Sequence, residues 1–155
     1  MADYDYSTKL GENSARALGF ALPISRKQSL MICNMLRGKP VQSAKKTLEN
    51  VIAMKIPVPM TRFNWDRGHK AGMAAGRYPI KACDQFLKLI KSAESNAQFK
   101  GLGTAELIIS HIVAQKAPKV WRGQRTGRHE AKRTTVEVVV SEIKEAKKEK
   151  KSVKK

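Results

Sequence analysis

Two segments of alternating apolar residues, separated by a strongly basic segment, constrain the fold of this chain more than any other feature. One face of residues 106–116 carries Leu107, Ile109, His111 and Val113. In residues 133–143, Val136, Val138 and Val140 alternate with Glu137, Val139 and Ser141. Because alternation of this kind in β-branched residues is typical of strands, we expect one long β-hairpin over residues 104–143.

The connection between these two segments, residues 117–132, is basic and nearly free of aliphatic side chains. Its cations are Lys119, Arg122, Arg125, Arg128 and Lys132, against a single acid, Glu130. A connection of this length without secondary structure of its own is usually functional or disordered. We therefore expect a cationic loop that lies among phosphates. Ten residues per strand, at about 3.3 Å each, would carry this tip roughly 30 Å from the domain.

The remaining segments predict a small domain around the hairpin. Residues 15–22 predict a strand whose bulky side chains face the core, namely Arg16, Leu18, Phe20 and Leu22. A first helix should begin at Ser25, with Ser25 and Gln28 as a capping box, and end at Gly38. A second should run from Pro40 to Ile52 and a third from Pro79 to Ala97. We expect an α+β fold, in which a small three-stranded antiparallel sheet packs against three helices and a long β-hairpin protrudes.

The ends of the chain differ from this single domain, residues 15–143. Residues 1–14 predict an N-terminal arm that orders on contact with a partner, and residues 144–155 a Lys-rich tail.

The net charge indicates the kind of partner. The chain has 155 residues with 31 Lys and Arg against 13 Asp and Glu, a formal charge of +18. Self-repulsion at this charge opposes folding unless a polyanion supplies counter-charge, and nucleic acid is the first candidate. An anionic membrane is second, but no segment combines a basic helical face with bulky apolar anchors, and neither a spanning run nor a secretory leader is apparent.

Cys33 and Cys83 form no CxxC pair, and we expect buried free thiols in a reducing cytoplasm.

Residues 55–76 form an irregular segment, because Pro57 and Pro59 exclude a helix. Its basic residues are interleaved with aromatic residues and glycines: Arg62, Arg67, His69 and Lys70 with Phe63, Trp65, Gly68 and Gly72. Cations meet phosphates and planar rings stack on unpaired bases, so an RNA-facing loop is favoured over a solvated connection. For Trp65 alone we favour a side chain that plugs the core.

No active site or metal centre can be assembled from the sequence. The histidines His69, His111 and His129 occur in unrelated segments, without Cys or acid at metal-ligand spacing. Asp66 adjoins Arg67, which favours a local salt bridge, and no nucleophile-elbow or phosphate-loop motif occurs. We expect no enzyme, cofactor or metal.

The alternative to an RNA-binding protein is a DNA-architectural protein with a basic β-arm. Such proteins insert an apolar residue or proline at the tip of the arm, and here only Trp121 could serve.

Many short motifs occur here in the order in which one family has them. They include ALGFALPIS (17–25), CNMLRGKP (33–40), LENVI (48–52), RFN (62–64), GHK (68–70), GRYPIKA (76–82) and AESNA (93–97). Over roughly residues 14–143, the chain resembles the universal large-subunit ribosomal protein of the exit-tunnel constriction, in its archaeal–eukaryotic branch. That family is the twenty-second large-subunit protein in the bacterial scheme and the seventeenth in the eukaryotic one. Relatives usually have a longer hairpin tip than RGQRTGRHEAKRTT (122–135).

The resemblance implies a structural constituent of the large ribosomal subunit in the cytoplasm. It implies binding to large-subunit rRNA, support of subunit assembly, and a hairpin tip that lines the polypeptide exit tunnel beside the nascent polypeptide. Neighbouring ribosomal proteins are further partners, and neither membrane insertion nor a homo-oligomer is expected. With the basic pattern, it gives these rRNA-binding residues: Arg26, Lys27, Arg62, Asn64, Arg67, His69, Lys70, Arg77, Tyr78, Lys81, Lys116, Lys119, Arg122, Arg125, Arg128, Lys132 and Arg133. The tunnel tip would comprise Trp121, Arg122, Gln124, Arg125, Arg128 and His129.

Overall fold

The two alternating segments pair with each other in the computed structural model, which describes residues 4, 6–9, 11, 13–125 and 127–142. β5 (Leu107–Lys116) and β8 (Thr134–Glu142) are antiparallel, with Ile112 opposite Val138. β1 (Ser14–Leu22) pairs with the other edge of β8, so the strand order is β1-β8-β5. The predicted α+β fold with a three-stranded antiparallel sheet is confirmed. The Lys-rich tail, 144–155, lies outside the described residues.

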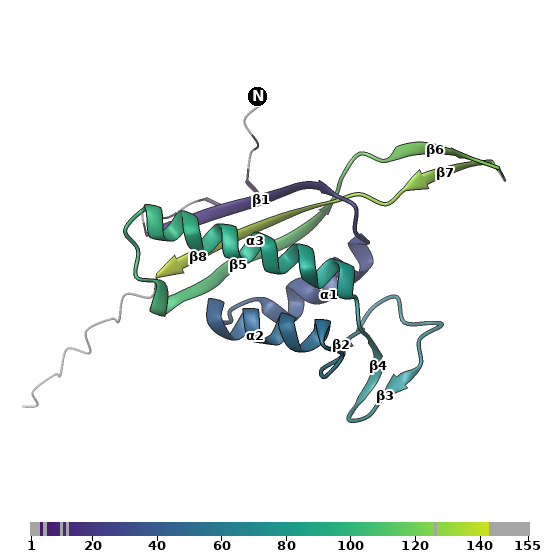
Figure 1. Cartoon of the computed structure of the whole chain (residues 1–155), viewed down its shortest axis with the longest axis horizontal. Coiled ribbons are helices and arrows are strands. Elements are labelled where there is room, and N and C mark those ends of the chain that lie inside the picture. Colours follow the sequence, from purple (N-terminus) through teal and green to yellow (C-terminus); the bar gives the residue numbers. More distant parts are fainter. Residues whose placement is uncertain (1–3, 5, 10, 12, 126, 143–155) are drawn as a thin grey trace, which may run out of the picture.

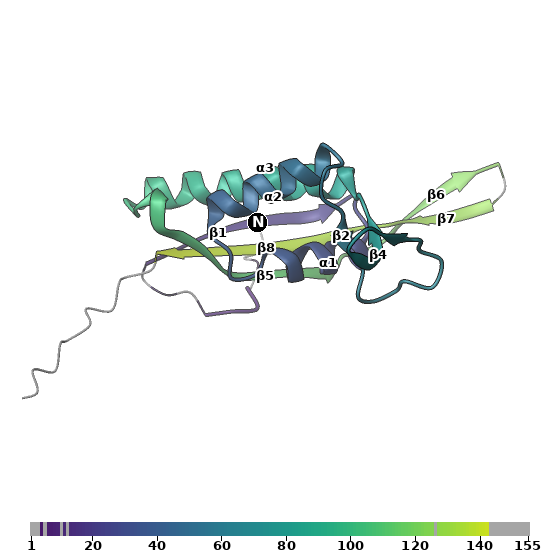
Figure 2. The same cartoon turned by 90° about the horizontal axis from the view of Figure 1, so that it is seen from below.

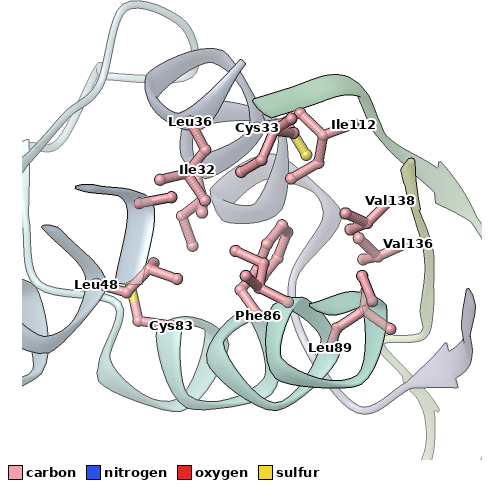
Figure 3. Packing of buried hydrophobic residues seen from close by; sticks show 14 of the residues in the cluster. Ile32, Cys33, Leu36, Leu48, Cys83, Phe86, Leu89, Ile112, Val136 and Val138 are labelled. Carbon is pink, nitrogen blue, oxygen red and sulfur yellow. The ribbon is translucent and has the colours of Figure 1, made fainter. Parts of the chain in front are cut away.

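Three helices cover one face of this sheet (Figures 1 and 2). They are α1 (Arg26–Leu36), α2 (Val41–Ile52) and α3 (Ile80–Phe99), and α3 packs along β1 while α1 packs on β5. The side chain of Phe86 is fully buried among Ile32, Leu48 and Val138, as Figure 3 shows. Both cysteines are buried and free, as predicted, and burial raises the pKa of each thiol to about 12.

A second, smaller sheet occupies the segment that was expected to be irregular. β2 (Val58–Pro59), β3 (His69–Lys70) and β4 (Met73–Arg77) pair in the order β2-β4-β3, and a short 3₁₀ helix, η1 (Thr104–Glu106), precedes β5. This sheet lies beside the N-terminal end of α3 (Figure 1). It holds the basic loop, residues 61–68, at one end of the domain.

The predicted orientation of β1 is wrong. Its small residues Ala15, Ala17 and Gly19 are buried, whereas Arg16 and Phe20 are exposed. The reason is α3, which packs directly over β1 and donates a hydrogen bond from Asn96 Nδ2 to Arg16 O at 2.8 Å. Small side chains on that face let the helix backbone approach closely. The predicted capping box is also absent, because Ser25 makes no side-chain hydrogen bond at the start of α1.

The segment expected as a loop has strands of its own. β6 (Val120–Gln124) and β7 (Gly127–Ala131) pair antiparallel with Arg122 opposite His129, and they project beyond the main sheet (Figure 1). We call these two strands the distal ribbon. β5 and β8 belong to the domain's core sheet, so the prediction that these two strands carry the tip away from the domain is wrong. The segments that extend beyond the core sheet are the distal ribbon and its two short connections, residues 117–119 and 132–133 (Figure 1).

Candidate nucleic-acid interface

A cationic hollow lies where the distal ribbon leaves the domain. Its volume is about 290 Å³, and it is lined by Ser25, Arg26, Lys27, Lys116, Lys119, Lys132 and Arg133. The six cations come from the start of α1, the end of β5 and the two connections to the ribbon. Lys119 pairs with Glu130, but no acid lines the hollow itself within the described residues. Such a concentration of one charge attracts a polyanion.

Hydrogen bonds link the start of β8 to β1 and to the connection between β1 and α1, and they bring these cations together. Thr134 Oγ1 donates to Ile24 O at 2.9 Å, and Arg133 Nη1 donates to Ala21 O at 3.0 Å. Arg133 is half-buried, and its Nε is buried without a hydrogen-bond partner among the described residues. Arg133 therefore ties the start of β8 to β1 as well as adding charge.

A second hollow adjoins the first because Lys27 lines both. Its volume is about 410 Å³, and its lining residues are Lys27, Phe63, Trp65, Asp66, Arg67 and Arg77. The Lys27 ammonium lies 4.8 Å from the centre of the Phe63 ring, a cation–π contact. The two hollows form one basic surface, which we call the cationic face.

Trp65 does not plug the core, and that prediction is wrong. Its side chain is 96% exposed, while Val58 and Met60 of the same segment are buried in its place. The expected Asp66–Arg67 salt bridge is also absent, since Arg67 Nε donates instead to Phe63 O at 2.8 Å. An exposed indole beside exposed cations is the arrangement that base stacking requires.

The remaining predicted contact residues belong to the loop, the small sheet and the start of α3, and apart from Arg77 they do not line this hollow. Lys70 Nζ lies 5.5 Å from the centre of the Tyr78 ring. The exposed members of the set are Arg62, Asn64, His69, Lys70, Arg77 and Lys81, and Tyr78 is half-buried. In the small sheet His69 lies opposite Ala75 and Lys70 opposite Met73, while Arg77 lies opposite Val58.

Most of the predicted tip residues lie on the distal ribbon and are exposed to solvent. Arg122, Arg125, Arg128 and His129 are exposed, and Trp121 is 62% exposed. The side chain of Gln124 lies outside what the structure describes. Since the ribbon buries almost no apolar surface, its arginines are available to a partner rather than to the core.

Sequence reasoning missed a buried carboxylate on the sheet face away from the helices. Glu137 of β8 has no exposed side-chain surface and accepts hydrogen bonds from Tyr4 Oη, Ser7 N, Ser7 Oγ and Gln115 Nε2 at 2.7–3.0 Å. Burial by itself raises the pKa of this carboxyl, but the bonds from Ser7 and Tyr4 and the nearby His111 outweigh burial, so the pKa is lowered. A lone acid among valines was the available signal. Tyr4 and Ser7 of the expected arm therefore contact this chain's own sheet.

Among the described residues, no group of three or more His, Cys, Asp or Glu could hold a metal ion. Nor does any helix in that part of the chain have the length and apolar character needed to cross a membrane.

The sequence is similar to one family over most of its length. The profile described as ribosomal protein L22p/L17e matches residues 17–144. Large ribosomal subunit protein uL22 of Methanococcoides burtonii is 40% identical over 151 residues, which span 92% of this chain and 99% of the relative. The protein of the same name from Staphylothermus marinus is 41% identical over 156 residues, with the same coverage. That from Archaeoglobus fulgidus is 38% identical over 146 residues, 88% of this chain and 94% of the relative.

Proposed function

Because the chain belongs to the L22p/L17e family of ribosomal proteins, in its archaeal–eukaryotic form, we propose that its cationic face and distal ribbon bind large-subunit rRNA. A member of this family is a structural component of the large ribosomal subunit in the cytoplasm and not an enzyme. The proposal concerns which surfaces of this chain perform that role.

The observation that carries the proposal is the hollow at the ribbon's root. Six cations from three separate segments meet there without a lining acid among the described residues. Neutralising RNA phosphates releases counterions, so affinity should fall steeply with salt, with a slope of about −0.7 to −0.9 per contact. The surrounding RNA would also hold the distal ribbon, since an isolated two-stranded hairpin is marginal in water.

The distal ribbon would extend from the bound domain into the RNA. We propose that RNA encloses the ribbon and that its end lines the polypeptide exit tunnel. Trp121, Arg122, Gln124, Arg125, Arg128 and His129 would then face the nascent polypeptide. Placement of the domain against several RNA segments and neighbouring ribosomal proteins would support subunit assembly. Residues 15–143 would act as the RNA-binding domain, with 1–14 as an arm and 144–155 as a tail.

Binding of the full chain to folded large-subunit rRNA and to duplex DNA at equal salt tests the proposal. We expect tighter binding to the rRNA, and co-sedimentation with large subunits that survives a high-salt wash. Replacing Arg122, Arg125 and Arg128 together by Ala should leave the domain folded and reduce the salt slope by about 2 to 3. Equal affinity for duplex DNA would favour the DNA-architectural alternative. An unchanged salt slope would remove the ribbon from the RNA interface.

A further inference from the structure

The hollow beside the loop contains one residue that a purely phosphate-binding surface should avoid. Asp66 lines it together with Lys27, Arg67 and Arg77. A carboxylate repels phosphate and weakens the field of the cations around it. Among the described residues Asp66 makes no ion pair, although two arginines line the same hollow. Neutralising a neighbour within the fold therefore does not account for its presence.

Two aromatic rings line this hollow beside its charged residues. Trp65 is 96% exposed, so its ring is open to a partner. Phe63 is 42% exposed and is also contacted by the Lys27 ammonium. The volume of about 410 Å³ falls within the roughly 300–1,000 Å³ typical of small-molecule pockets. Bases that leave the RNA stack are bound on such rings. The hollow has the size and the walls for one nucleobase.

The backbone of the loop is held in a strained form at this place. Phe63 has a φ of +57°, a left-handed conformation that is rare for an aromatic residue. Arg67 maintains it, with its amide donating to Asn64 O at 3.0 Å and its Nε donating to Phe63 O at 2.8 Å. Arg67 Nη1 is buried without a partner among the described residues. Strain of this kind is often kept where a binding site needs it.

The carboxylate of Asp66 can accept hydrogen bonds but cannot donate them, so it favours a base whose edge carries donors. A carboxylate accepts only, through two parallel oxygens. The Watson–Crick edge of guanine offers two adjacent donors, N1–H and the N2 amino group. Adenine and cytosine each pair a donor with a ring acceptor, and uracil has one donor between two acceptors. The edge is free only in an unpaired nucleotide.

We propose that this hollow binds one unpaired guanine of the RNA, stacked on Trp65 and Phe63, with its Watson–Crick edge on Asp66 and its phosphates on Arg67 and Arg77. This inference rests on the RNA binding proposed above. It adds base selectivity to a surface whose other contacts are with phosphate. It also explains why an acid belongs in a cationic face.

The test uses the full chain and dye-labelled RNA stem-loops that differ at one unpaired loop position: guanosine, inosine or adenosine. Anisotropy should give about tenfold tighter binding for guanosine than for adenosine, with inosine in between because it lacks the N2 amino group. In a Trp121→Phe background, guanosine RNA should quench the remaining Trp65 fluorescence. Asp66→Asn should abolish the preference and keep the salt slope. Asp84→Asn, which changes a half-buried acid of α3 that pairs with Lys88, should change neither.

The outcomes separate this inference from the proposed function. Equal affinity for the three RNAs with a steep salt slope, or a preference that survives in Asp66→Asn, would overturn the guanine site and leave RNA binding intact. Failure to bind any of the RNAs or the folded rRNA at low salt would overturn the proposed function itself. Trp65→Ala should weaken guanosine RNA about tenfold or more and adenosine RNA less. Circular dichroism of each variant should match the parent, because Trp65 and Asp66 are outside the core.

Discussion

The hydroxyl of Tyr4 donates a hydrogen bond to Oε1 of Glu137 at 2.7 Å, joining residues 133 apart in sequence. Glu137 lies in the central strand of the sheet, and its side chain has no exposed surface. The bond therefore fixes part of the N-terminal segment against the sheet face that the helices leave uncovered. The buried carboxylate is stable there because Ser7 and Gln115 supply its other donors.

Removing either partner of this bond should destabilise the fold. Tyr4→Phe should lower the free energy of unfolding by about 1.5 kcal/mol, and Glu137→Gln by roughly 2 to 3 kcal/mol, because the amide leaves buried donors mismatched. The double variant should lose less than the sum, since both changes remove the same bond. Urea denaturation of the four proteins measures this. Additive losses would show that the bond contributes nothing.

The same carboxylate predicts a dependence of stability on pH. The folded-state pKa of Glu137 lies below its usual value of 4.5, so its stabilisation is fully present above about pH 4.5 and is lost as pH falls through the folded pKa. His111 Nε2, 3.8 Å from Glu137 Oε2, favours the ionised carboxyl when protonated. The difference in unfolding free energy between parent and Glu137→Gln should therefore shrink as pH falls. A difference that stays constant down to pH 2 would contradict the lowered pKa.

Gly38, between α1 and α2, should tolerate no side chain without strain. Its φ is +74°, and a Cβ there would meet nothing within 4 Å, so the expected loss of about 1 to 2 kcal/mol in Gly38→Ala comes from the backbone alone. Gly123 of the distal ribbon is the matched control, since it also has open space and its φ is not in the left-handed range. Thermal denaturation should leave Gly123→Ala near the parent. Equal losses in both variants would rule out the conformational explanation.

The two buried thiols should be unreactive in the folded chain. Burial raises the pKa of Cys33 and Cys83 from 9.0 to about 12, so at pH 8 almost no thiolate is present. A thiol reagent such as dithionitrobenzoate should label both cysteines in denaturant and neither of them within minutes in native buffer. Fast labelling of either cysteine in native buffer would show that the core around that residue opens locally and exposes the thiol.

The main sheet could be predicted from the sequence because its strands carry their own signal. Val136, Val138 and Val140 of β8 lie in the core, as their alternation predicts. In β5 the predicted face holds only for Leu107 and Ile109. A bulge between Ile109 and His111 then reverses the faces, so Ile112 and Ala114 are buried in place of His111 and Val113. β6 and β7 carry no such pattern, and only backbone pairing and the turn at Gly127 define them. For β1, both faces have apolar residues, and the choice between them depends on α3, which is 60 residues further along the chain.

The types of residue in the candidate site could be predicted from the sequence, but their grouping in space could not. Charge and the interleaved aromatics identified the basic residues, but the meeting of Arg26, Lys116 and Arg133 in one hollow depends on tertiary contacts. Glu137 was missed because a polar residue in an alternating strand indicates a solvated face. Its donors Tyr4 and Ser7 lie about 130 residues away, beyond any local pattern.

The distal ribbon should be ordered by its partner more than by its own contacts. Apart from half-buried Ala131, every side chain that the structure describes in β6 and β7 is exposed, so few apolar contacts oppose local opening. In the free protein, backbone amides of residues 120–125 and 127–131 should exchange with deuterium much faster than those of Val138 and Val140 in β8. When folded rRNA binds, we expect exchange in the ribbon to slow by at least about tenfold, with β8 almost unchanged because it is already protected.

A Val136→Ala variant, which destabilises the core sheet, is the control. Faster exchange of the β8 amides in this variant would show that their protection reports global stability. If the ribbon amides were as protected as those of β8 without RNA, then cross-strand pairing alone would hold the ribbon, and RNA would only dock against a rigid arm.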